Sequence, residues 1–208
     1  MDFDPASHLG AVRRRLTTTS REGVELRLLT VERTFDAAQE EVWEALTTAD
    51  RIERWMLPVT GDLRVGGRFQ LEDNAGGEVL ECVEPERLAI TWEYGGQLSW
   101  VDVSLRPVDD GTLLQLDHAA PVDPQTWEEF GPGAVGIGWE MGLLGMALHL
   151  ANPGAPRPDV SASPELVELM TGSSKGWAEA EVAAGGDPER ARAAADRTLA
   201  AYTATPEE

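Results

Sequence analysis

Residues 131–151 read GPGAVGIGWEMGLLGMALHLA, and this stretch decides the fold. Pro132 stands where a first-turn proline belongs, and Asn152-Pro153-Gly154 ends the run, so the pattern predicts a helix. Between these limits only Glu140 and His149 are clearly polar. The helix is therefore expected to be a core element of the protein.

The apolar residues of this stretch fall on more than one face of the helix. One stripe at helical spacing consists of Trp139, Leu143, Met146 and Leu150. A second stripe, on another face, consists of Ile137, Leu144 and Leu148. A soluble helix that is apolar on several faces must be covered on several faces. We therefore expect the rest of the chain to form a concave wrapping around it.

A membrane-spanning helix is the alternative interpretation, because about 20 apolar residues can cross a bilayer. Three features of the sequence argue against it. Glu140 has no compensating charge in the run, five glycines between residues 133 and 145 dilute it, and no basic flank follows. We therefore expect no contact with a membrane.

Composition limits the partners and cofactors of the chain. The 208 residues carry a formal net charge of −20 at pH 7, which excludes nucleic acid and anionic membranes as partners of the chain as a whole. Cys82 is the only cysteine, so no internal disulfide or multi-cysteine metal site is expected. The three histidines lie too far apart for a zinc pattern, so we expect no metal and no other cofactor. No N-terminal apolar segment suits a signal peptide, so a cytoplasmic location is expected.

Strands and short helices are predicted before the long helix. Two strands, Val12–Thr19 and Val24–Phe35, are joined by a turn. Asp36 is expected to cap a first short helix, and Asp50–Met56 is expected to form a second one that closes an end of a sheet. From Gly61 to His118, apolar segments alternate with glycine-rich turns at regular spacing. This spacing indicates an antiparallel sheet with one buried face.

Two further helices are predicted after the long helix. Ser163 is expected to cap the first, with Pro164 at its first position, and Asp187-Pro188 begins the second. The apolar stripe of the first consists of Leu166, Met170, Ser173, Trp177 and Ala180. We expect both helices to pack back on the domain. The alternative is a dimerisation arm, so a monomer and a homodimer are both open.

Short sequence motifs occur in a defined order along the chain. They are Val42-Trp43-Glu44-Ala45-Leu46-Thr47, Ile52-Glu53-Arg54-Trp55, the segment from Asp62 to Phe69, the segment from Glu78 to Leu88, Ile90-Thr91-Trp92, Gly111-Thr112-Leu113-Leu114 with His118, and Gly138-Trp139. Together they resemble the SRPBCC (START-like) superfamily, and within it the proteins similar to the C-terminal domain of the heat-shock chaperone ATPase activator. The resemblance covers roughly residues 24–151.

The resemblance implies an α+β, helix-grip fold. In this fold a curved antiparallel β-sheet wraps around a long C-terminal helix, and two short helices close one end. This agrees with the wrapping inferred above from the long helix alone. We divide the chain into a START-like helix-grip domain at residues 11–151 and a helical C-terminal extension at residues 152–208.

A ligand cavity is expected between the sheet and the long helix. Gly138, Gly142 and Gly145 leave one side of the helix almost bare, which either admits another backbone or leaves space. A ligand pocket typically encloses about 300–1,000 Å³. The predicted ligand-binding residues are Trp55, Phe69, Trp92, Trp100, His118, Trp139 and Leu143. The acids that could orient a ligand there are Glu81, Glu93, Asp117 and Glu140.

Three functions are open on these grounds, and no catalytic residue is assigned. The first, which we favour, is a binding module for a hydrophobic or amphipathic small molecule. The second, implied by the resemblance, is a co-chaperone-like interaction domain that activates a heat-shock chaperone ATPase. The third is an enzyme of the cyclase or hydratase type, which the superfamily contains. That enzyme would need His118 and a carboxylate within hydrogen-bond reach.

Overall fold

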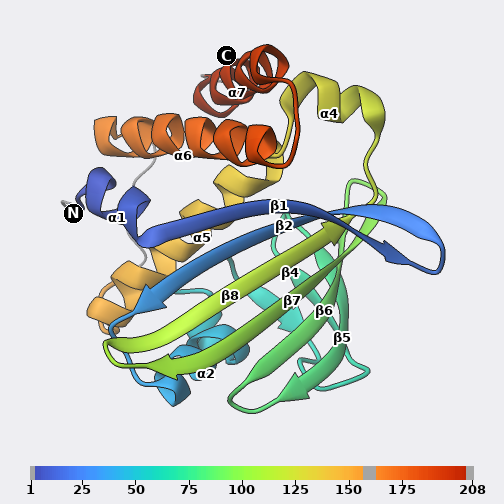
Figure 1. Ribbon diagram of the computed structural model, residues 1–208. Coiled ribbons are helices and arrows are strands. Elements are labelled where there is room, and N and C mark those ends of the chain that lie inside the picture. The colour runs from blue at the N-terminus through green and yellow to red at the C-terminus, as the bar shows by residue number, and fades with distance from the viewer. Residues whose placement is uncertain (1–2, 157–162, 205–208) are drawn as a thin grey trace.

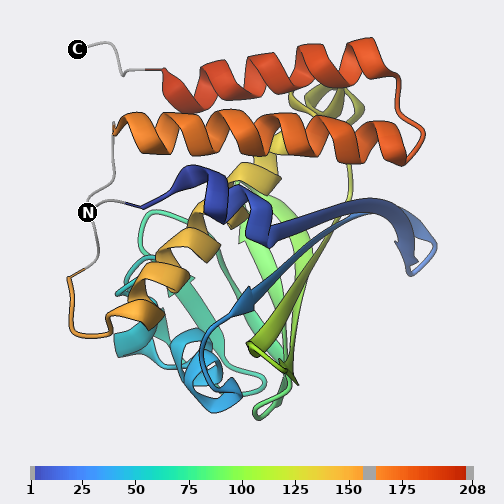
Figure 2. The ribbon, with the colours of Figure 1, turned by 60° about the vertical axis from the view of Figure 1, so that its left-hand side comes forward.

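A curved antiparallel sheet holds one long helix against its concave face in the computed structural model, which describes residues 3–156 and 163–204 (Figures 1 and 2). The elements are α1 (Pro5–Ala11), β1 (Val12–Arg21), β2 (Val24–Phe35), α2 (Gln39–Thr47), α3 (Ala49–Ile52), β3 (Val59–Gly61), β4 (Arg68–Leu71), β5 (Gly76–Val83), β6 (Arg87–Tyr94), β7 (Gln97–Val108), β8 (Gly111–Ala120), α4 (Pro124–Phe130), α5 (Gly133–Ala151), α6 (Pro164–Ala183) and α7 (Pro188–Thr203). The predicted α+β helix-grip fold is confirmed.

The eight strands form one sheet in the order β1-β2-β8-β7-β6-β5-β4-β3. From β3 to β8 the strands follow one another as the predicted meander, each antiparallel to the next. The first hairpin joins this meander at its last strand, because β2 pairs with β8 and Val31 lies opposite Leu116. Segments from the two ends of the domain thus lie side by side as the second and third strands of the sheet.

Strict alternation of burial gives the sheet one core face. On β7 the buried side chains are Ser99, Val101, Val103 and Leu105, and the half-buried residues between them include Asp102 and Ser104. On β8 the even-numbered residues from Thr112 to His118 are buried in the same way. Side chains of alternate residues point to opposite faces of a strand, so these buried sets mark the concave face.

Helices α2 and α3 cover one end of the grip. The predicted cap at Asp36 is wrong, because α2 begins at Gln39 with Ala38 in the capping position and no side chain caps it. Gln39 instead donates hydrogen bonds of 3.2 Å to the carbonyl oxygens of Pro85 and Leu105, which ties the helix to the sheet. The indole N–H of Trp55, just beyond α3, donates to the Ala45 carbonyl at 2.9 Å and joins the two helices.

Glycines let α5 approach its neighbours closely. A β-carbon at Gly136 would overlap the indole of Trp177 from α6, and one at Gly145 would overlap the backbone carbonyl of Trp55. Both positions therefore need the small residue for packing. In the described part of the chain, α5 is the one helix that is long and apolar enough to cross a membrane, by length and composition only. Here it is the central helix, between the sheet and α6 (Figure 2).

The polar residue in the middle of α5 has a specific partner. Glu140 is fully buried, and both of its carboxylate oxygens accept from Arg14 on β1, from Nε at 2.7 Å and from a terminal guanidinium nitrogen at 2.5 Å. A buried carboxylate is tolerated when such a bidentate pair satisfies it. Glu140 therefore ties the edge strand to α5 and does not point into a ligand cavity.

The helices that follow α5 pack on it and on the N-terminal segment. Ser163 caps α6 as predicted, and α7 begins at Pro188 as predicted, with Asp187 as its cap. Helix α6 lies across α5, α1 and β1, and its Trp177 side chain is fully buried, while α7 packs on α6 and α4 (Figures 1 and 2). Residues 157–162 and 205–208 of the extension lie outside the described residues. The division into two domains stays a prediction.

Candidate functional site

An apolar cavity of about 110 Å³ lies between the concave face of the sheet, α5, and the segment formed by α2 and α3. We call it the inner cavity. It is smaller than the range typical of ligand pockets, and closer to an engineered cavity of about 150 Å³ that binds benzene. Its volume therefore suits a molecule with a single ring.

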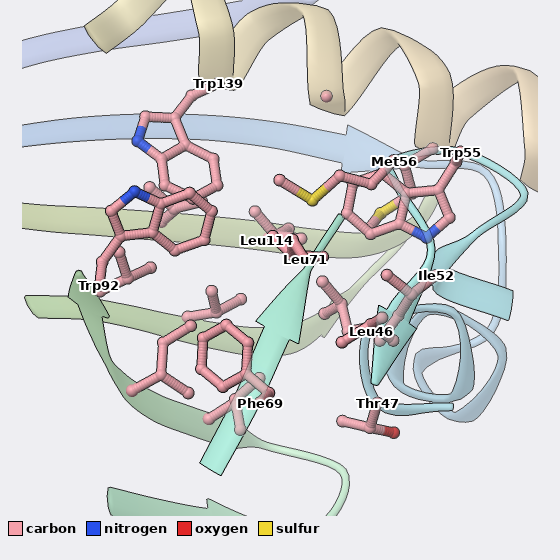
Figure 3. Close-up of a pocket in the computed structure, with 18 of the residues that line it drawn as sticks. Leu46, Thr47, Ile52, Trp55, Met56, Phe69, Leu71, Trp92, Leu114 and Trp139 are labelled. Carbon is pink, nitrogen blue, oxygen red and sulfur yellow. The ribbon is translucent and has the colours of Figure 1, made fainter. Parts of the chain in front are cut away.

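Five of the seven predicted ligand-binding residues line the inner cavity. These are Trp55, Phe69, Trp92, Trp139 and Leu143. Figure 3 shows the indoles of Trp92 and Trp139 together at one end, with Trp55 at the other. The ring centroids of Trp92 and Trp139 lie 4.9 Å apart with the planes tilted by 54°. The pair forms an aromatic wall at that end of the cavity.

Trp100 was predicted to face the cavity, and this is wrong. It lies on the convex face of the sheet, where the guanidinium of Arg21 sits 4.6 Å from its ring centroid. The cause is strand alternation. Val101 and Val103, one and three residues after Trp100 on β7, point inward and line the cavity, so Trp100 points outward.

His118 lies behind the aromatic wall and does not line the inner cavity. The indole N–H of Trp139 donates to Nδ1 of His118 at 3.0 Å. The other ring nitrogen, Nε2, is 2.8 Å from the hydroxyl of Ser99, which in turn donates to the Trp92 carbonyl at 3.0 Å. Nδ1 accepts the hydrogen bond from Trp139 and therefore carries no hydrogen. In the neutral ring Nε2 then carries the hydrogen and donates it to the Ser99 hydroxyl.

This chain of hydrogen bonds fixes the chemistry of His118. Burial lowers the pKa of the imidazole from 6.5 to about 4, so the ring is neutral at physiological pH. Both ring nitrogens are occupied by Trp139 and Ser99, and neither is bonded to a carboxylate in the described part of the chain. The pair of His118 with a carboxylate, which the cyclase or hydratase hypothesis requires, is therefore not formed in this structure. What His118 does is hold the Trp139 indole in place.

The acids predicted as possible cavity groups lie elsewhere. Glu140 is paired with Arg14, Glu81 with Arg87 and Glu93 with Arg68. Asp117 accepts from the Thr30 hydroxyl at 2.5 Å and from Gln115 at 2.6 Å. Among the residues that the structure describes, Thr47 is the only polar side chain in the lining of the inner cavity, and no charged one lines it.

Several lining residues were not predicted to belong to the site. They include Leu46, Ile52, Met56 and Leu71, which are labelled in Figure 3, and Leu88, Ile90 and Gly142. A signal for some of them was present in the sequence. Ile52 and Met56 accompany Trp55 in one short helical segment, and Leu88 and Ile90 share the strand face of Trp92. Leu71 also had a signal, because it lies two residues after Phe69 on β4 and alternation places both on the same buried face.

Comparison with known proteins agrees with this architecture. Residues 36–150 match the family described as "Activator of Hsp90 ATPase homolog 1-like protein". A comparison with curated proteins gave no match. The crystal structure of CalU16 from Micromonospora echinospora is 36% identical and has a TM-score of 0.67, over 82% of this chain and 98% of that chain. The solution structure of CalU16 is 34% identical with a TM-score of 0.70, over 84% and 97% of the two chains.

A more distant structure shares the same fold. Protein MLL2253 from Mesorhizobium loti is 25% identical with a TM-score of 0.53, over 62% of this chain and 99% of that chain. The family match covers more than half of the sequence, and the CalU16 structures extend the likeness over most of it. The resemblance inferred from the ordered motifs is thereby confirmed. The chain belongs to the family of Activator of Hsp90 ATPase homolog 1-like proteins.

Proposed function

We propose that the protein binds a hydrophobic or amphipathic small molecule, with an apolar part of that molecule in the inner cavity. The observation that carries this proposal is the character of the cavity itself. It is unfilled space at the centre of the fold, lined by apolar side chains of the sheet and of α5. Apolar pockets of this kind bind chiefly by removing ligand surface from water.

Gly142 supports the proposal because it keeps part of the cavity wall open. A β-carbon at this position would meet only the Trp55 ring, at 3.7 Å, which is an ordinary van der Waals contact. The helix could therefore carry a side chain here, and a larger one would project into space that is now empty. Unlike Gly136 and Gly145, Gly142 is not required by a close neighbour.

The test is a titration with toluene, which matches the cavity in size. A binding free energy of about 4 kcal/mol corresponds to a dissociation constant of about 1 mM, which calorimetry or tryptophan fluorescence can measure. We expect saturable binding by the native chain and its loss in Gly142→Leu. The matched control is Val167→Leu, because Val167 lies exposed on α6 away from the cavity. Equal binding by native protein and Gly142→Leu would refute the proposal.

Interaction with a heat-shock chaperone is the second candidate, and membership of the family favours it. The measurement is the ATPase rate of a purified Hsp90 chaperone with and without this protein. A several-fold increase that saturates with protein concentration would support this function. An unchanged rate would leave small-molecule binding as the better account. The two functions are separable, because Gly142→Leu alters the cavity and leaves the surface unchanged.

A further inference from the structure

A groove of about 330 Å³ lies on the far side of the aromatic wall from the inner cavity. We call it the outer groove. Met56, Trp92 and Trp139 line both spaces, so these three side chains lie between the cavity and the groove. The volume of the groove is three times that of the inner cavity. A ligand with more than one ring does not fit in the inner cavity alone and would extend into the groove.

The outer groove gathers exposed apolar side chains from three parts of the fold. Tyr94 on β6 is 59% exposed, Leu98 on β7 is 44% exposed, and Val135 on α5 is 40% exposed. Soluble proteins rarely leave large apolar side chains clustered in contact with water unless the patch binds something. Tyr202 of α7 completes the wall, with its hydroxyl donating to the Ala134 carbonyl at 2.9 Å.

The two halves of the aromatic wall are held differently. Trp139 is fixed by its hydrogen bond to His118. The indole N–H of Trp92 has no hydrogen-bond partner within residues 3–156 and 163–204, and its side chain is only half-buried. Trp92 is therefore the less firmly held half of the wall that stands between the cavity and the groove.

Charge narrows the class of ligand. In the described part of the chain, neither the inner cavity nor the outer groove is lined by an Asp, Glu, Lys or Arg side chain. His118, which borders the groove, is neutral and has both ring nitrogens occupied. A carboxylate would enter this site without a cationic partner, in a protein of net charge −20. Aromatic side chains on both sides offer stacking surfaces to planar rings.

We propose that the ligand is an uncharged molecule with several aromatic rings, which occupies the inner cavity and the outer groove together, with Trp92 moved aside between them. This inference rests on the proposed function, since one end of the ligand lies in the inner cavity. It adds a second subsite and excludes fatty acids and other carboxylates as preferred ligands. The C-terminal helix α7 takes part in the site through Tyr202.

The experiment compares three probes: toluene, flavone, and a flavone that carries one carboxylate. Each is titrated by calorimetry against the native chain, Gly142→Leu, the double variant Tyr94→Ala/Leu98→Ala, and the control Val167→Ala. Tyr94, Leu98 and Val167 are exposed, so these variants are expected to fold. Circular dichroism checks the fold of every variant.

We expect the double variant to weaken flavone binding by about tenfold and to leave toluene binding unchanged. Gly142→Leu should weaken both, and the carboxylated flavone should bind the native chain at least about tenfold more weakly than flavone. If toluene behaves as expected but the double variant binds flavone like native protein, the outer groove is not a subsite and the proposed function stands. If Gly142→Leu leaves flavone binding unchanged, the ligand does not span the two spaces.

Two further results separate the inference from the function on which it rests. Equal affinity for both flavones would overturn the assignment to an uncharged ligand while leaving the groove as a subsite. Failure of toluene and flavone alike to bind the native chain would refute the proposed function, and the inference with it.

Discussion

Alanine at three glycines of α5 is expected to give opposite effects on stability, although the substitution is the same. In a helix interior, glycine costs about 1 kcal/mol relative to alanine. If propensity alone decided the outcome, alanine at Gly136, Gly142 and Gly145 would stabilise the protein equally. The environments of the three positions predict otherwise.

Gly142→Ala should stabilise the protein. The new β-carbon meets only the Trp55 ring at 3.7 Å, and it fills part of the inner cavity. The helix-propensity gain of about 1 kcal/mol adds to about 0.8 kcal/mol for burying one methyl group. For a protein of this size each kcal/mol raises the Tm by about 2–4 °C, so an increase of about 3–7 °C is expected.

Gly136→Ala and Gly145→Ala should destabilise it. At Gly136 the β-carbon would overlap the indole of Trp177, which is fully buried and cannot move into solvent. At Gly145 it would overlap the backbone carbonyl of Trp55. Overpacking costs about 1–3 kcal/mol or more, which outweighs the gain in propensity.

The assay is thermal unfolding of the three variants by calorimetry, with urea unfolding at 25 °C as a second measure. The order of stability should be Gly142→Ala above native protein, with Gly136→Ala and Gly145→Ala below it. A common shift in one direction for all three would refute the packing described for α5. If the Tm of Gly142→Ala lies below that of native protein, the space beside Gly142 is filled.

Three other perturbations follow from buried groups. Arg14→Ala should destabilise the protein by about 3–5 kcal/mol in urea unfolding, because it leaves Glu140 buried and unpaired, whereas Arg14→Met with Glu140→Leu should recover most of the loss; equal losses in both variants would contradict the burial argument. Deleting residues 163–208 should lower the Tm and increase binding of a hydrophobic dye, because the deletion removes α6, whose fully buried Trp177 packs against α5. An unchanged Tm would show that the extension contributes nothing to the core. Burial lowers the pKa of His118 from 6.5 to about 4 in the folded state, so between these pH values only the unfolded chain binds the proton, and the free energy of unfolding should fall by up to about 3 kcal/mol as the pH drops from about 6.5 to 4. His118→Gln should flatten this part of the stability–pH curve. An unchanged slope would show that His118 is not the titrating group.

Local patterns were enough to predict the elements that carry the fold. The apolar run at residues 131–151 predicts a helix that needs covering, and the structure covers it with the sheet and α6. The spacing of turns predicts the meander, and its strands form a single sheet. Periodicity and turn residues are properties of short segments, so they can be read without knowledge of the rest of the chain.

Partners distant in sequence were not predictable in the same way. Glu140 appears uncompensated within its own helix because Arg14 lies 126 residues away. The need for glycine at position 136 becomes clear only when Trp177 is placed against it. No periodicity or motif in the sequence predicts either contact, since both depend on how α6 and β1 pack on α5.

Trp100 is a different case, because its sequence did contain the answer. It alternates with Val101 and Val103 and shares its strand face with Asp102 and Ser104, so the polar face was the better assignment. Trp100 was assigned to the cavity because its side chain is aromatic, although its position in the alternation placed it on the polar face. Arg21, at the end of β1, places its guanidinium over the ring, which is how the outer face of the sheet accommodates it.

The pairing of β2 with β8 has a consequence for the rate at which the protein folds. Phe35 lies opposite Thr112, so the β2–β8 pairing, which joins the first hairpin to the meander, forms only after the intervening chain has been brought into a closed loop. The entropy of closing that loop must be overcome before the strand contacts stabilise anything, and topologies of this kind fold in milliseconds to seconds. On the ribosome, the first hairpin must wait for β8 to be synthesised, with Leu29 and Val31 still uncovered. During that interval β2 exposes an unpaired strand edge, which is a site where nascent chains can aggregate.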